Sequence, residues 1–159
     1  MDENTDLKEE LNVAFARSLR YLSFRPRSEK ELSDFLNKKN LNPQVIQAVI
    51  ERLKKEKLLG DDDFVKWWIE QRQEFKHKSK FFIKQELIQK GVNKSIIEKH
   101  LEESAEDDSI AARVLFNKAL KRFEGLPEME FKQKMGAYLQ RRGHQFRVIN
   151  ELIKEYFSK

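Results

Sequence analysis

The sequence predicts an all-α protein made of three tandem three-helix repeats, stacked into an elongated, curved array. Only five glycines and three prolines occur among 159 residues, and both residue types interrupt regular structure. Lysine, glutamate and leucine, which favour helices, are abundant. An apolar pattern with helical spacing also recurs three times, about 50 residues apart. A recurring unit of this length is typical of stacked helical repeats.

The repeats share one internal register. Three segments align without a gap: 28–50, 79–101 and 131–153. One leucine occupies the same position in each: Leu36, Leu87 and Leu139. An apolar residue stands four positions before each leucine, on the same face of a helix. Four positions after it stands a residue that tolerates the left-handed conformation in which helices end: Asn40, Gly91 or Gly143. Each segment is therefore helix, short turn, helix.

In the first repeat we expect a helix over 7–24, which ends before Pro26. Ser28 and Glu31 have the S-x-x-E spacing of a capping box, which begins the second helix. Asn42 is a good N-cap for the third helix, and the proline after it fits the first helical turn, where its missing N–H costs nothing.

In the second and third repeats the first helix is expected over 62–76 and 108–123. Acidic runs precede both, at 61–63 and 107–108. Carboxylates at a helix start cap free N–H groups and oppose the helix dipole. We favour this interpretation over a Mg²⁺ site, since no other phosphate-holding groups accompany the acids. The expected divisions are an acidic N-terminal tail and three repeats: 1–10, 11–60, 61–106 and 107–159.

The charge is unevenly distributed. The chain has a net charge of +5, but residues 1–10 contain five acids and one lysine, so the other 149 residues carry +9. A basic body suits a polyanionic partner, because each neutralised phosphate releases counterions. A merely soluble, Lys/Glu-rich helical surface would have a similar composition, and charge alone leaves both readings open.

Several function classes are excluded or disfavoured. Without cysteine there is no disulfide or thiolate metal site. The sequence lacks the usual zinc, nucleophile-elbow and phosphate-loop motifs, and no two of His77, His100 and His144 are spaced to share a metal on one helix. No signal peptide or long apolar run is present. We expect a cytoplasmic protein that is not an enzyme, needs no cofactor and does not enter the membrane. His144 occupies an apolar position of the repeat and is expected to be a packing residue.

Basic residues cluster beside aromatic residues in all three repeats, often near the turns between helices. We take these as candidate contacts to nucleic acid or a nucleoprotein filament: Arg20, Arg25, Arg27, Lys66, Arg72, Lys76, Lys78, Lys80, Lys132, Lys134, Arg141, Arg142 and Arg147. Cations contact phosphates, and aromatic faces stack on bases. The alternative is a solvated helix face for the cations and core positions for aromatics such as Tyr21, Phe35 and Phe75. Trp67, beside a core position, is the aromatic that we expect to be exposed.

Three groups of motifs follow one another along the chain. The first is A-R-S-L-R-Y-L-S-F-R-P-R-S-E-K-E-L at 16–32. The second comprises L-L-G-D-D-D-F-V at 58–65 and E-L-I-Q-K-G-V at 86–92. The third is Y-L-Q-R-R-G-H at 138–144. In order, spacing and coverage, from about residue 12 to 157, the chain resembles the RecX family of bacterial regulatory proteins. Ser79 stands where that family often has glycine, and His144 where it usually has an aromatic or apolar residue.

The resemblance implies a fold of three three-helix modules and a regulator of the RecA recombinase. Such proteins bind RecA and its filament on single-stranded DNA, lie along the filament groove, and usually inhibit ATPase, strand-exchange and co-protease activities. We expect a monomer that contacts both RecA and DNA. Two alternatives remain: a sequence-nonspecific single-stranded nucleic-acid-binding protein acting alone, and a helical adaptor that binds only protein.

Overall fold

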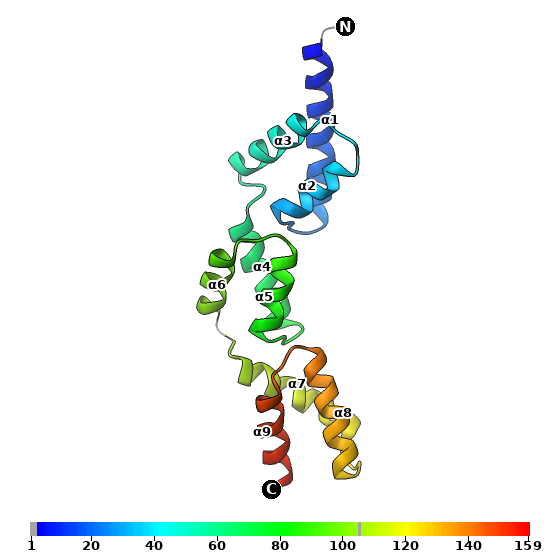
Figure 1. The fold of residues 1–159 in the computed structure, drawn as a ribbon, viewed down its shortest axis with the longest axis vertical. Helices are drawn as coiled ribbons and strands as arrows, with labels where there is room; N and C mark the ends of the chain where they lie inside the picture. Colours follow the sequence, from blue (N-terminus) through cyan, green and yellow to red (C-terminus); the bar gives the residue numbers. More distant parts are fainter. Residues whose placement is uncertain (1–2, 105) are drawn as a thin grey trace. The chain divides into compact units, whose positions relative to one another are not determined.

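The computed structural model describes residues 3–104 and 106–159, and its regular structure is entirely helical in this part of the chain (Figure 1). The all-α prediction is therefore confirmed. The helices are, in order, α1 (Glu3–Phe24), α2 (Glu29–Asn37), α3 (Pro43–Lys55), α4 (Asp61–Glu74), α5 (Lys80–Gln89), α6 (Lys94–Glu103), α7 (Asp108–Phe123), α8 (Glu128–Arg141) and α9 (Phe146–Phe157). Helix α1 begins at Glu3, before the expected start at residue 7, so most of the expected acidic tail is helical. Residues 1 and 2 of that tail lie outside the described residues.

The chain divides into two compact units. The first comprises the chain up to Trp67 together with Leu87–Ile97, and the second comprises Trp68–Glu86 together with Glu98–Lys159. The division runs through α4, α5 and α6. Each unit therefore contains one complete three-helix repeat and part of the second repeat. The elongated, curved stacking of all three repeats stays a prediction.

In the first unit, α1, α2 and α3 pack around an aliphatic core. Leu32 and Leu36 of α2 are fully buried, as are Val49 and Leu53 of α3 and Ala14 of α1. Their four-residue spacings place them on one face of each helix, as the sequence pattern predicts. Burying such side chains contributes roughly 1.5–3 kcal/mol each, which is what holds short helices together.

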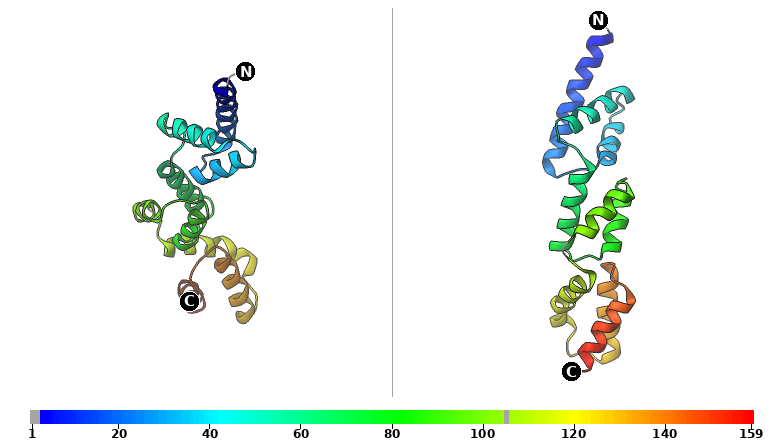
Figure 2. Two further views of the ribbon diagram at one scale, coloured as in Figure 1. Left: turned by 45° about the horizontal axis from the view of Figure 1, so that its top comes forward. Right: turned by 90° about the vertical axis from the view of Figure 1, so that its left-hand side faces the viewer.

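In the second unit, α7, α8 and α9 lie together in each view (Figure 2). Their core is richer in aromatic residues. The Phe131 ring of α8 stacks on Tyr156 with 4.9 Å between ring centroids and meets Phe116 of α7 edge-on at 6.1 Å. Met135 and Leu139 continue the buried face of α8.

The turns between the second and third helices have the predicted conformation. Asn40, Gly91 and Gly143 have φ values of 56°, 80° and 88°, in the left-handed region that ends helices. Capping is also as expected at α2, where Ser28 and Glu31 form a complete capping box. Within the described residues, no helix is long and apolar enough to cross a bilayer.

Candidate nucleic-acid interface

The capping serine of α2 also contacts the next repeat. Ser28 Oγ accepts a hydrogen bond from the Glu31 N–H at 3.1 Å and donates one to the Lys90 carbonyl at 2.8 Å. The Glu29 N–H donates to Oδ1 of Asp61, at the start of α4, at 2.9 Å. The N-terminus of α2 is thus capped partly by the second repeat, within the first unit.

The same arrangement recurs in the second unit. Ser79 Oγ accepts from the Phe82 N–H at 3.1 Å and donates to the Gly143 carbonyl at 2.6 Å. The Lys80 N–H donates to Oδ1 of Asp108 at 2.7 Å. Sequence reasoning assigned the acidic runs to their own helices, and Asp107 does cap α7 through the Ser109 N–H. Asp61 and Asp108 stand in the first turns of α4 and α7, as expected, but they accept backbone hydrogen bonds from the preceding repeat.

These contacts define two equivalent joints. The first joint consists of residues 24–31 with Asp61, Lys90 and Gly91. The second joint consists of residues 75–82 with Asp108, Arg142 and Gly143. Each contains a loop with a phenylalanine, two cations and a serine, F-R-P-R-S at 24–28 or F-K-H-K-S at 75–79. Each also contains a cation immediately before the glycine of the facing turn. The joints therefore gather basic residues from two repeats at one place.

Like charges are close enough in the second joint to affect one another. Burial lowers the pKa of Lys78, the nearby cations Arg72, Lys76 and Arg142 lower it further, and Glu86 works against them. Arg72 pairs with Glu86 at 2.9 Å, and Lys78 Nζ lies 3.8 Å from the same carboxylate. Arg72 and Lys78 thus share the Glu86 carboxylate, with Lys76 and Arg142 close enough to act on Lys78.

A carboxylate also lies among the cations of the first joint. Glu31 pairs with Arg25 and lies 3.4 Å from Lys90 Nζ. Burial raises the pKa of Glu31, but its contacts with Arg25, the Ser28 N–H and Lys90 outweigh burial and lower that pKa. Arg27 packs over the Tyr21 ring, 4.0 Å from its centroid. The two loop arginines are therefore held in place.

Twelve of the thirteen predicted cations fall into three groups. Five are half-buried and held by a carboxylate, an aromatic ring or both: Arg25, Arg27, Arg72, Lys78 and Arg142. Two are exposed and pair with a glutamate one turn earlier on α8: Lys132 and Lys134. Five are exposed and form no ion pair with any described residue: Arg20, Lys66, Lys76, Arg141 and Arg147. The remaining one, Lys80, is half-buried, and its backbone N–H takes part in the second joint. That these cations contact a partner stays a prediction.

Two aromatic residues differ from expectation. Phe75, a suggested core residue, is 63% exposed and lies just past the end of α4. Trp67, expected to be exposed, is half-buried, with its ring centroid 6.4 Å from that of Phe64. By contrast, Tyr21 and Phe35 are partly buried and stack with centroids 4.1 Å apart.

His144 is a packing residue, as predicted, and is only 3% exposed. Its Nε2–H donates to the His77 carbonyl at 2.8 Å, which joins the turn before α9 to the loop before α5. Burial lowers the pKa of His144 and Arg142 lowers it further, against raising effects from the His77 carbonyl, Asp108 and Glu106. The neutral imidazole is therefore favoured in the folded chain. No group of three acidic or histidine side chains in the described residues could hold a metal ion.

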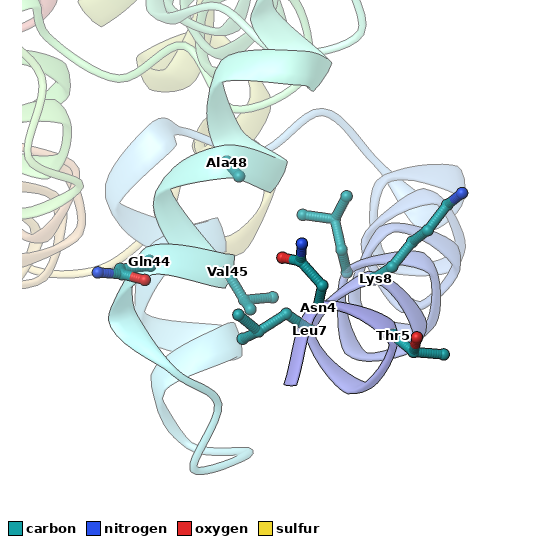
Figure 3. A pocket seen from close by; sticks show the side chains of 8 residues that line it. Asn4, Thr5, Leu7, Lys8, Gln44, Val45 and Ala48 are labelled. Carbon is teal, nitrogen blue, oxygen red and sulfur yellow. The ribbon is translucent and has the colours of Figure 1, made fainter. Parts of the chain in front are cut away.

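A cavity of about 640 Å³ opens in the first unit between the start of α1 and α3 (Figure 3). Asn4 and Leu7 point toward Val45 in it. Its walls also include Leu11, Gln44 and Ala48. None of the residues that line it is a histidine or a carboxylic acid, so the cavity offers no acid–base pair.

Three models of the RecX family match the chain in succession. The match to "RecX, first three-helix domain" covers residues 14–53, the second domain 61–101 and the third domain 106–153. The chain belongs to the RecX family. A "Regulatory protein RecX" from Clostridium acetobutylicum is 34% identical over all of this chain and 77% of its own length. Another, from Bacillus subtilis, is 36% identical over 92% of this chain, which spans only 56% of that relative.

Solved RecX structures have the same fold. A "Crystal structure of regulatory protein RecX" matches 98% of this chain and 78% of its own, with a TM-score of 0.76 and 24% identity. The structure of RecX from Lactobacillus salivarius matches 93% of this chain and 97% of its own, with a TM-score of 0.75 and 21% identity. The organisation into three three-helix domains and the resemblance to RecX are therefore confirmed, and the RecX-family relatives are named as regulators.

Sequence reasoning missed two members of this RecX-family chain's joints. Neither Lys90 nor Phe24 was among the candidates. The repeat register contains the signal for both. A cation stands three positions after every reference leucine: Lys39, Lys90 and Arg142. A phenylalanine stands twelve positions before the first two leucines: Phe24 and Phe75.

Proposed function

We propose that this chain regulates RecA by binding RecA and its filament on single-stranded DNA, and that it most often inhibits ATPase, strand exchange and co-protease activity. It acts as a cytoplasmic monomer, without catalysis of its own and without a cofactor. The observation that supports this most is the repetition of a cationic joint in both units. The names of the RecX-family relatives support a regulatory role.

The two joints suit a long, regular polyanion better than a single compact partner. In the second joint Lys78 and Arg142 are held, whereas Lys76 is exposed, as is Arg141, which immediately precedes Arg142. Held cations lose little conformational freedom on meeting a phosphate, while the exposed ones adapt to its position. Joints in one chain also raise one another's effective concentration, so individually weak contacts are sufficient. Occupying several protomers in this way would restrict the movements that ATP turnover requires.

A titration of RecA ATPase on single-stranded DNA tests the proposal. We expect the rate to fall as the protein approaches RecA in concentration. Arg141→Glu should weaken this effect and leave thermal stability nearly unchanged, because Arg141 is exposed and forms no ion pair with a described residue. Arg142 is a poorer probe, since it packs 3.7 Å from the Tyr138 ring centroid and donates to the Tyr138 carbonyl at 3.0 Å.

Lys118→Glu on α7 is the matched control. It makes the same change of charge at another exposed position, and we expect it to inhibit ATPase as the wild type does. An unchanged ATPase rate at saturating wild-type protein would contradict the proposal. Equal loss of inhibition in both variants would mean that net charge, and not the second joint, governs binding.

Binding to DNA without RecA separates the two alternatives. A sequence-nonspecific single-stranded nucleic-acid-binding protein would bind naked oligonucleotide tightly, with a steep dependence on salt. A protein-only adaptor would inhibit or bind RecA with no sensitivity to the DNA.

A further inference from the structure

The two joints share an exposed aromatic ring. Phe24 is 73% exposed and Phe75 is 63% exposed. Both stand twelve positions before the reference leucine of their repeat, where the first helix has just ended or is ending. Two large apolar rings left in water at equivalent positions contribute little to folding, since burial is what makes a phenylalanine stabilising.

Cations accompany both rings at the same offsets. The residues one and three positions after the phenylalanine are Arg25 and Arg27 in the first joint, and Lys76 and Lys78 in the second. Arg27 is held over the Tyr21 ring and uses only its Nε–H, on the Tyr21 carbonyl at 3.4 Å. Its terminal nitrogens make no hydrogen bond with a described residue and can donate to a phosphate.

We propose that Phe24 and Phe75 are base-stacking residues, and that each joint binds a short segment of single-stranded DNA. The ring packs against one base, and the cations that follow it contact the adjoining phosphates. This rests on the proposed function only in identifying the strand as DNA within a RecA filament. A naked strand presents the same chemistry.

The choice of a single strand follows from the ring itself. A phenylalanine has no hydrogen-bonding group, so it cannot make the hydrogen bonds that distinguish most base edges in a duplex groove. It can pack on the face of any base, and such faces are accessible only where bases are unstacked from a duplex. A purely apolar protein contact would not explain why each ring is followed by two cations at the same offsets.

Binding to labelled oligothymidylate and to an abasic strand of equal length, at one fixed salt concentration, tests the stacking. We expect Phe24→Leu and Phe75→Leu each to weaken oligothymidylate binding about tenfold, because leucine keeps the apolar bulk but has no aromatic face. Neither should change binding to the abasic strand, which keeps the phosphates. Phe24→Trp and Phe75→Trp should bind oligothymidylate at least as tightly as the wild type.

Phe146→Leu is the matched control, since Phe146 is also 73% exposed but lies outside both joints, at the start of α9. It should leave binding to both strands unchanged. Far-UV circular dichroism and melting temperature should be the same for all variants.

Three outcomes would overturn the stacking: oligothymidylate affinity unaltered in the leucine variants, equal losses on both strands, or no wild-type binding to oligothymidylate even at low salt. None of these depends on RecA. Failure of the ATPase titration would count against the proposed function and leave the result on naked DNA intact.

Discussion

Replacing Gly143 with alanine tests the second joint. The substitution carries a backbone penalty and a steric penalty, and a control variant measures the backbone penalty separately. Gly143 has φ +88°, a conformation that costs an L-residue about 1–2 kcal/mol. The added Cβ would also lie 2.6 Å from Ser79 Oγ and overlap the Cβ of Phe82. Forcing an extra methyl group into a filled space costs about 1–3 kcal/mol. We therefore expect Gly143→Ala to lower the free energy of unfolding by about 2–5 kcal/mol.

Gly125 is the control that measures the backbone penalty alone. Its φ of +85° is nearly the same, but nothing lies within 4 Å of where its Cβ would be. Gly125→Ala should therefore cost only the backbone penalty, about 1–2 kcal/mol. The difference between the two variants, about 1–3 kcal/mol, measures how closely the facing loops approach in the second joint.

Urea unfolding, followed by far-UV circular dichroism and tryptophan fluorescence, provides the measurement. The unfolding midpoint should shift with little change in the m-value, since neither substitution alters the surface exposed on unfolding. Equal losses in the two variants would refute the close approach. Gly91→Ala should behave like Gly143→Ala, because its Cβ would lie 2.7 Å from the Cβ of Lys30 in the first joint.

Three further changes probe the joints. Asp108→Ala removes the acceptor of the Lys80 N–H and should lower the urea-unfolding free energy by about 0.5–2 kcal/mol, with a smaller loss in Asp108→Asn. Burial lowers the pKa of His144 from its usual 6.5. The neutral side chain therefore contributes its full share of the free energy of unfolding above pH 6.5, and this contribution is lost as the pH falls below that value. His144→Gln, which keeps an N–H donor, should flatten this decline in pH-dependent unfolding. Lys76→Ala should reduce the salt slope of single-stranded DNA binding by about 0.7 while melting temperature stays constant.

The fold was largely predictable because its signals are local. The capping box at Ser28 and the left-handed turns at Asn40, Gly91 and Gly143 depend on residues within a few positions of one another, and all appear as expected. Helix α7 begins and ends at the predicted residues, 108 and 123. The start of α1 was misplaced, since the acidic, polar residues before Leu7 show no helical periodicity but still continue the helix.

The joints were not predictable in the same way. A serine at a helix start predicts a local cap, but nothing in its neighbourhood indicates that its hydroxyl also donates to Lys90, 62 residues away. Likewise Asp61 and Asp107 look alike in sequence, yet one caps the preceding repeat and the other caps its own helix. Charge counting also cannot separate a cation such as Arg72, held between Glu86 and the Trp68 ring, from an exposed one.

In the second joint, the charge of Lys78 does not stabilise the folded chain. The pKa of Lys78 is lowered by burial first and then by Arg72, Lys76 and Arg142, so its charged form is less favoured in the folded chain than in the unfolded one. Glu86 raises this pKa but does not cancel the combined effect of burial and the neighbouring cations. A polyanion that binds the folded chain would relieve the remainder and stabilise the joint in proportion to its own affinity. If the second joint binds a polyanion as we propose, the folded chain should be more stable in the presence of that polyanion than in its absence.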